Sequence, residues 1–181
     1  MTEENDIPTL DRWTLFSHYL SNAENYQTSY LRMCDVASFQ DFGRMWNHTH
    51  PKLVGDVSRI IRIQGHRITS WSFFKNGIAP EWEHPENESG ITFSVRSVMS
   101  PDDAYTLWET LVTNCVLSKH PDTLNGVQLS RKSTHVRPHE PGLFMKCDLW
   151  FSHDADCVTV AQWIRETLPN HAFVHASRAT R

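Results

Sequence analysis

The segment from residue 71 to residue 83, Trp-Ser-Phe-Phe-Lys-Asn-Gly-Ile-Ala-Pro-Glu-Trp-Glu, is the most informative part of the chain. Its first half is typical of a buried aromatic strand, and the Asn-Gly and Pro that follow predict a turn. The turn presents Trp82 and Glu83 side by side. An indole can stack on a cationic base while a carboxylate accepts N–H donors from the base edge, so this pair suits such a base. A tryptophan is more often a core residue than a ligand platform, which is the competing interpretation.

The composition is typical of one globular domain. With 181 residues, 39% of them hydrophobic, the chain can bury one sizeable core. No apolar run reaches the ~18–20 residues of a membrane span, and the acidic start resembles neither a secretory signal nor a transit peptide. We therefore expect a cytoplasmic protein, or one that is also nuclear, with no membrane partner. A formal net charge of −4 argues against tight non-specific binding to DNA or RNA, so any nucleotide contact must be local.

The cysteines and histidines predict neither disulfides nor a metal site. The four cysteines are Cys34, Cys115, Cys147 and Cys157. They are far apart and form no C-x-x-C pair, so in a reducing compartment we expect small buried hydrophobes. His135, His139 and Cys147 are the nearest approach to a ligand set, but the prolines between them indicate a loop rather than a metal-binding helix. No cofactor is expected.

Apolar periodicity predicts a mixture of strands and helices. Strands are expected at residues 11–18, 30–36, 58–63, 70–75, 91–96, 126–132, 142–152 and 172–176. Helices are expected after Ser38, where Asp41 completes a capping pattern, after Ser100, and from about residue 155 to 168. This order predicts an α+β fold, in which a curved, mainly antiparallel sheet of about seven or eight strands carries three helices on its convex face. Residues 1–8 are expected to be a flexible arm, 9–176 the domain and 177–181 a tail.

The strand predicted at residues 142–152 has two contrasting faces. One face is entirely apolar or sulfur-bearing: Leu143, Met145, Cys147, Leu149 and Phe151. The other face carries Phe144, Lys146, Asp148 and Trp150, so that a lysine and a tryptophan flank Asp148. A basic group beside an aromatic ring suits a phosphate and a base.

These landmarks resemble the translation initiation factor 4E family, whose members bind the messenger-RNA cap. The densest match is residues 74–83, Phe-Lys-Asn-Gly-Ile-Ala-Pro-Glu-Trp-Glu. Weaker motifs occur in the family order, including Arg-Trp-Thr-Leu at 12–15, Gln-Asp-Phe at 40–42, Glu-Thr-Leu at 109–111 and Leu-Trp at 149–150. The resemblance covers residues 7 to about 176. It implies a protein without enzymatic activity, whose cupped sheet holds 7-methylguanine between two aromatic rings.

The resemblance also implies a role for individual residues in the cap site. Tyr26, where the family usually has tryptophan, and Trp82 would stack on the base, Glu83 would accept hydrogen bonds from its edge, and Trp150 would lie near the methyl group. Methylation makes guanine cationic. Two π faces and a carboxylate therefore favour the methylated base over plain guanine.

Recognition of the cap phosphates is implied for Lys146 and for either Arg131 or Lys132. Matching the letters favours Arg131, whereas alternation along the strand favours Lys132. A further family arginine is replaced by Thr92. The loop after Lys132, residues 133–141, is longer than is usual in the family, and its Arg137 could replace lost phosphate contacts or be solvated.

On the opposite, helical face the family binds proteins that carry a short Tyr/Leu motif, such as an initiation factor 4G-like scaffold or a repressor. The matching positions here are Pro8, Phe39, Gly43, Trp108 and Val112. Gly43 replaces the tryptophan that anchors the partner, so a weakened site, a different partner and a different docking mode all stay open.

The leading interpretation is a cap-binding protein that recruits messenger RNA to translation initiation. A cap-sequestering repressor and a protein-interaction paralogue with a weakened pocket are the alternatives, the latter because of Tyr26 and the missing arginine. Nothing in the sequence supports a cap-processing enzyme, since it has no phosphate-cradling glycine loop, no nucleophile elbow and no acidic cluster spaced for two metals.

Overall fold

The computed structural model describes residues 6–19, 30–53, 62–131, 143–168 and 173–178. Within these residues, antiparallel strands form one sheet in the order β2-β1-β4-β6-β7-β5-β8, with the short β3 paired to β4. The strands are β1 (Pro8–Tyr19), β2 (Tyr30–Ser38), β3 (Arg62–Ile63), β4 (His66–Lys75), β5 (Ile91–Met99), β6 (Leu124–Arg131), β7 (Leu143–Phe151) and β8 (Phe173–Arg178). The helices are α1 (Phe39–Leu53), α2 (Pro85–Glu88), α3 (Pro101–Val116) and α4 (Cys157–Thr167).

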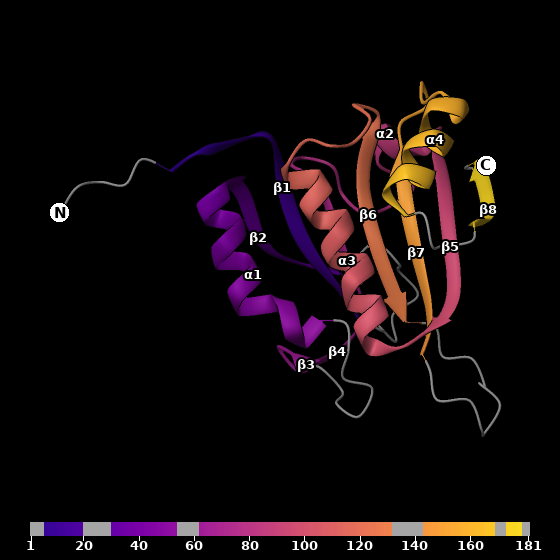
Figure 1. Ribbon diagram of the computed structural model, residues 1–181. Helices are drawn as coiled ribbons and strands as arrows, with labels where there is room; N and C mark the ends of the chain where they lie inside the picture. The colour runs from indigo at the N-terminus through magenta and orange to yellow at the C-terminus, as the bar shows by residue number, and fades with distance from the viewer. Residues whose placement is uncertain (1–5, 20–29, 54–61, 132–142, 169–172, 179–181) are drawn as a thin grey trace.

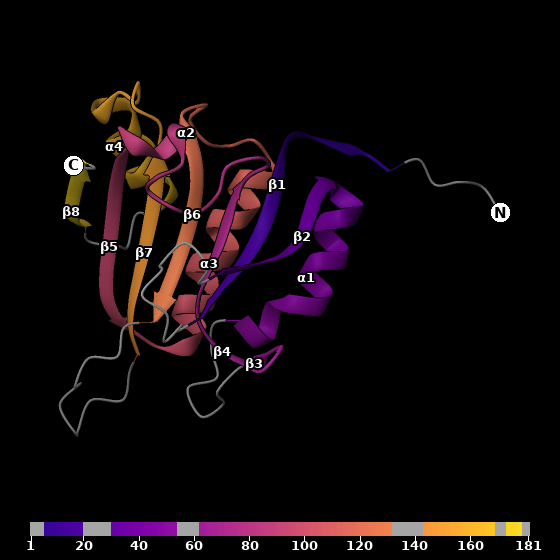
Figure 2. The same cartoon turned by 180° about the vertical axis from the view of Figure 1, so that it is seen from behind.

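The three longer helices, α1, α3 and α4, lie over one face of the sheet (Figure 1). The view from behind shows the strands in front of these helices (Figure 2), and we call this side, where none of the three longer helices lies, the helix-free face. The α+β class predicted from the sequence, with three helices on one side of a mainly antiparallel sheet, is confirmed. The fourth helix, α2, was not predicted, because a single turn of four residues has no periodicity to detect.

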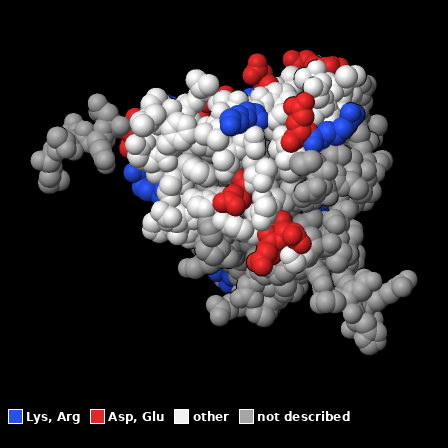
Figure 3. All heavy atoms as spheres, in the orientation of Figure 1, with Lys and Arg blue, Asp and Glu red and all other residues white. Residues whose placement is uncertain are grey.

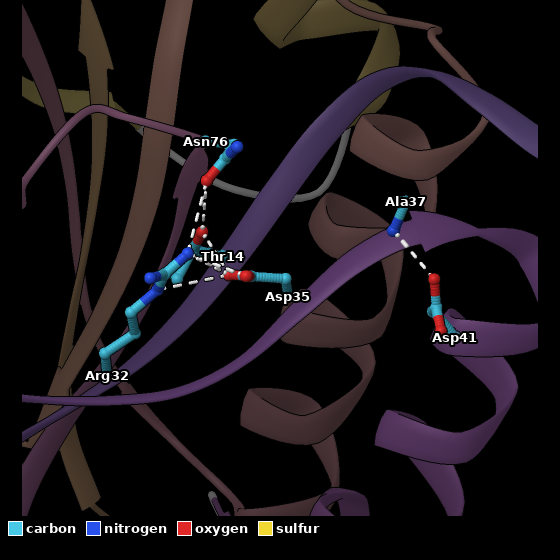
Figure 4. Close-up of polar contacts among 6 residues, drawn as sticks. All are labelled: Thr14, Arg32, Asp35, Ala37, Asp41 and Asn76. Atoms are coloured by element: carbon cyan, nitrogen blue, oxygen red, sulfur yellow. Dashed lines mark hydrogen bonds and ion pairs between the residues drawn. The ribbon is translucent and has the colours of Figure 1, made fainter.

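Both helix starts predicted from capping residues are confirmed. Asp41 donates its backbone N–H to Ser38 Oγ at 3.0 Å, and its carboxylate accepts the N–H of Ala37 at 3.1 Å (Figure 4). Ser100 and Asp103 form a reciprocal capping box at the start of α3. These contacts satisfy N–H groups that have no partner within the helix.

Alternation along the strands separates two apolar clusters. The main core, between sheet and helices, includes Met145, Cys147 and Leu149 of β7 together with the buried stripe of α3. A smaller cluster on the helix-free face contains Phe16, Phe74 and Trp150. The two faces predicted for β7 are thus confirmed.

The cysteine prediction holds only in part. Cys115 and Cys147 are buried, and burial raises the pKa of both thiols. Cys34 is half-buried, whereas Cys157 is exposed because it is the first residue of α4. None of the four forms a disulfide.

Two predicted boundaries differ from the structure. Strand β8 continues to Arg178, which pairs with Ile91, so the first residues of the predicted tail belong to the sheet. Strand β1 begins at Pro8, within the predicted arm, because Pro8 lies opposite Ser38. Of the strand predicted at 58–63, only residues 62 and 63 fall within the described part.

His18 of β1 is a buried titratable group on the helix-free face. Its Nε2 lies 2.6 Å from Ser72 Oγ and 3.4 Å from Gln128 Nε2. Burial lowers the pKa of His18 from 6.5 to about 4. Between these two pH values the unfolded chain binds a proton that the folded protein does not, so stability falls as the pH drops through this window.

We expect acidification from neutral pH to about pH 5 to cost ~2 kcal/mol of folding free energy through His18 alone. Urea denaturation at both pH values should show a smaller loss for His18→Gln than for the unchanged protein. The matched control is His153→Gln, which removes an exposed histidine. Equal pH dependence of the unchanged protein and His18→Gln would contradict the assignment.

Candidate functional site

Trp82 and Trp150 form the centre of the site. Their ring centroids are 4.0 Å apart and their planes are tilted by 31°. Trp150 is only 5% exposed, whereas Trp82 is 37% exposed. The indole at position 82 is therefore not a core residue: it rests on a buried ring and keeps part of its own surface open to solvent.

A glycine beneath this pair makes room for it. Phe74 packs edge-on against Trp150, with centroids 5.6 Å apart. A Cβ atom at Gly126 would lie 2.3 Å from a carbon of the Phe74 ring. Gly126 is also directly opposite Trp150 in the β6–β7 ladder. Any side chain at position 126 would displace Phe74 and with it the support of Trp150.

The turn that leads to Trp82 is fixed by its glycine and by β1 and β2. Gly77 has φ of +91°, a conformation that favours glycine. The N–H of Asn76 donates to the carbonyl of Arg12 at 2.8 Å. Asn76 Oδ1 lies 3.4 Å from both Thr14 Oγ1 and Arg32 Nη2, beside the 2.7 Å ion pair between Arg32 and Asp35 (Figure 4).

A buried asparagine holds the rest of this segment. Asn87 Nδ2 donates to the carbonyls of Ala79 and Glu81, each at 2.9 Å. Asn125 Nδ2 donates in turn to Asn87 Oδ1 at 3.0 Å and to the Glu86 carbonyl at 2.7 Å. The sequence analysis missed Asn87, because an asparagine among charged residues is indistinguishable from a solvated loop residue.

The carboxylate next to Trp82 is available to a ligand. Glu83 is exposed, and the described residues give it neither a hydrogen bond nor an ion pair. Glu81, one residue before Trp82, instead accepts a 3.4 Å hydrogen bond from the Tyr30 hydroxyl. Burial, with a further contribution from Glu81, raises the pKa of Tyr30, so this hydroxyl stays a donor.

The lysine expected to meet phosphates is already paired. Lys146 Nζ lies 2.7 Å from Asp148 Oδ2, and its side chain is 21% exposed. The other oxygen of Asp148 accepts a 2.5 Å hydrogen bond from Ser94 Oγ. All three residues belong to the neighbouring strands β7 and β5.

The structure describes only part of the remaining predicted cap site. Arg131 pairs in the β6–β7 ladder with Met145, a residue of the main core. Tyr26, Lys132 and Arg137 lie outside the described residues, so their roles stay predictions. The described residues contain no group of three or more potential metal ligands, and none of their helices could cross a membrane. The histidines of the 133–141 segment are likewise outside this part.

Two residues of the predicted partner face have almost no exposed surface. Trp108 and Val112 are 1% and 0% exposed and belong to the main core, because the apolar stripe of α3 is buried. Their role in partner binding stays a prediction. Pro8 is exposed and Phe39 is 38% exposed, and the space around a Cβ atom at Gly43 is open.

Ile7 lies beside Phe39. It is 59% exposed, and its carbonyl accepts the N–H of Phe39 at 2.9 Å, while Leu10 of β1 is 89% exposed. Figure 3 shows charged side chains at separate places on this side of the molecule, and at the start of α1 Arg44 pairs with Asp41 and Asp6. An exposed apolar surface thus persists at the start of α1, formed by residues other than those of α3.

Comparison with known proteins agrees with the fold. The family model for eukaryotic initiation factor 4E matches residues 8–175, and the chain belongs to this family. No curated protein sequence matches closely enough to be reported as a relative.

Several solved structures share the fold. A schistosome eIF4E in complex with m7GpppA and 4E-BP has 19% identity and a TM-score of 0.73, over 97% of this chain and 89% of that one. C. elegans eIF4E-3 with the 4E-binding protein Mextli and a cap analog has 17% identity and a TM-score of 0.68, over 91% and 87%. Ascaris suum eIF4E-3 with an m2,2,7G cap has 16% identity and a TM-score of 0.66, over 91% and 86%.

Replacing Asn87 by alanine should loosen the segment that carries Trp82. The change removes three buried hydrogen bonds, two to the Ala79 and Glu81 carbonyls and one from the Asn125 amide, which we expect to cost ~2–3 kcal/mol of folding free energy in urea denaturation. Asn47→Ala, a change of the same residue type at an exposed position of α1, should cost less than ~0.5 kcal/mol. Equal costs for the two variants would show that Asn87 does not hold the segment.

Proposed function

We propose that this protein binds the 7-methylguanosine cap of messenger RNA on its helix-free face and catalyses no reaction. The observation that carries the proposal is the half-exposed Trp82, held against buried Trp150 and followed by Glu83, whose carboxylate has no partner among the described residues. Family membership supports it, as do the cap analogs bound to structures of the same fold.

The arrangement suits a methylated guanine in particular. The exposed part of the Trp82 ring can stack on the base, which contributes ~1–3 kcal/mol, and the positive charge of the methylated base adds a cation–π attraction of ~0.5–2 kcal/mol. Glu83 can accept two N–H donors of the base edge in charge-assisted hydrogen bonds. Tyr26 would supply the second ring of the sandwich, and Trp150 the contact near the methyl group.

The phosphate chain of the cap would extend from the base toward the basic residues. Lys146 lies on the same strand as Trp150, two residues from Asp148. Of Arg131 and Lys132, Lys132 is the better candidate, because Arg131 is opposite the core residue Met145 in the β6–β7 ladder. Arg137 could add a further contact from the loop between β6 and β7.

A protein partner would dock on the opposite face, at the start of α1. The solved structures of the same fold contain 4E-BP or Mextli. Exposed Phe39 and Pro8, together with the open space at Gly43, offer an apolar surface there. A scaffold of the initiation factor 4G type bound to it would recruit the captured messenger RNA for translation. A repressor on the same surface, or cap binding without a scaffold, would silence it instead.

Calorimetric titration tests the cap site directly. The unchanged protein should bind 7-methylguanosine triphosphate at least about tenfold more tightly than GTP, because only the methylated base is cationic. Trp82→Ala should lose about tenfold or more of this affinity through the missing stack. Glu83→Gln should lose most of the discrimination, while the matched control Glu81→Gln should keep it. Equal affinity of the unchanged protein for the two nucleotides would refute the proposal.

The open position at Gly43 gives a test of the partner face. Gly43→Trp should strengthen binding of a helical peptide with the Tyr/Leu motif by about tenfold or more, because a buried indole is a typical interface hot spot. His48→Trp places the same side chain at an exposed position of α1 and should leave affinity unchanged. Fluorescence anisotropy of a labelled peptide measures both. If the two variants behave alike, the peptide does not dock at position 43.

A further inference from the structure

We infer that Asp148 is a positioning residue that holds Lys146 back from the cap phosphates, so that Lys146 contributes little to binding of the phosphate chain. The inference rests on the proposed cap-binding function. It starts from the carboxylate of Asp148, which is nearly buried inside the candidate site. Neither the stacking of the base nor the recognition of its edge uses this carboxylate.

The contacts of Asp148 use both of its oxygens. Oδ2 lies 2.7 Å from Lys146 Nζ, and Oδ1 accepts the Ser94 hydroxyl hydrogen bond. The residue is 4% exposed, so it is largely shielded from water. A carboxylate in such a place depends on these two partners to offset its lost hydration.

The strand register places Asp148 between Trp150 and Lys146. Trp150 is opposite Gly126 on β6 and Thr92 on β5. The next row toward the other end of the sheet contains Gln128, Asp148 and Ser94. The row after it contains Ser130, Lys146 and Arg96. A cap whose base lies near Trp150 must therefore pass Asp148 before its phosphates reach the level of Lys146.

Two physical effects then weaken phosphate recognition. The ion pair has no net charge, so Lys146 attracts an anion less than a free lysine would, and the carboxylate itself repels an approaching phosphate. Lys146 cannot turn fully to a phosphate without leaving a buried carboxylate unpaired, which is strongly unfavourable. Stacking on Trp82 and acceptance by Glu83 are unaffected by either effect.

The test compares 7-methylguanosine monophosphate with the triphosphate in calorimetric titrations at low and moderate salt. We expect the unchanged protein and Lys146→Gln to show the same ratio of the two affinities, within about twofold, and the same salt dependence. Lys146→Gln should change the triphosphate affinity by no more than about twofold, because the pair it removes was already neutral. Neither measurement requires a change at position 148.

Asp148→Asn frees Lys146 from its ion pair, while the amide oxygen of the new side chain at position 148 still accepts the hydrogen bond of the Ser94 hydroxyl. We expect this variant to bind the triphosphate about tenfold more tightly, with a steeper salt dependence and an unchanged affinity for the monophosphate. Adding Lys146→Gln to Asp148→Asn should remove the gain. The matched control is Asp102→Asn, which makes the same charge change at an exposed residue of α3 and should alter the triphosphate affinity by less than about twofold.

The outcomes separate this inference from the proposed function. If methylated nucleotides bind but Asp148→Asn gives no gain, or if the unchanged protein strongly prefers the triphosphate and loses that preference in Lys146→Gln, the inference is wrong and cap binding stands. If the unchanged protein binds no methylated nucleotide, the proposed function fails and the inference fails with it. Loss of binding to both nucleotides in Lys146→Gln would likewise overturn the inference.

Discussion

The packing of Phe74 over Gly126 is the constraint on which the rest of the site depends. Because position 126 has no side chain, the Phe74 ring lies directly over the backbone of β6 and supports Trp150, which in turn supports Trp82. This aromatic column starts on the buried surface of the sheet and ends in solvent. Its buried end supplies the packing energy, so its exposed end can stay partly open without loss of order.

A column of rings cannot by itself orient the polar groups beside it, and hydrogen bonds do this here. Asn87 fixes the backbone at Ala79 and Glu81, and Asn76 joins the same segment to β1. Since buried carbonyls and amides are costly to leave unpaired, these contacts restrict the segment to one path. The carboxylate of Glu83 is consequently presented next to the indole by a segment that these contacts hold in place.

Patterns among neighbouring residues predicted the features that local structure determines. Alternation assigned the two faces of β7, and capping residues located the starts of α1 and α3. The Trp82–Trp150 contact lay beyond such patterns, because it joins residues 68 positions apart through a strand order that no local pattern specifies. Asn87 was missed because its role comes from carbonyls it meets only in the folded state. Trp108 and Val112 show the limit of resemblance: it assigned them to a partner surface, whereas the fold gives both almost no exposed surface.

Because the two faces of each strand are separate, residues on the helix-free face can be substituted without changing the fold. In β7 the side chains of Cys147 and Leu149 pack in the main core, while Lys146 and Asp148 lie on the other side. A change at position 148 or its partner Ser94 therefore alters charge in the site without removing volume from the core. The same holds for Gly43 on α1, where the surrounding space is open and nothing in the core depends on a side chain. The charge of the helix-free face and the surface at the start of α1 can thus each be changed by very few residues, independently of one another and of the packing that maintains the sheet.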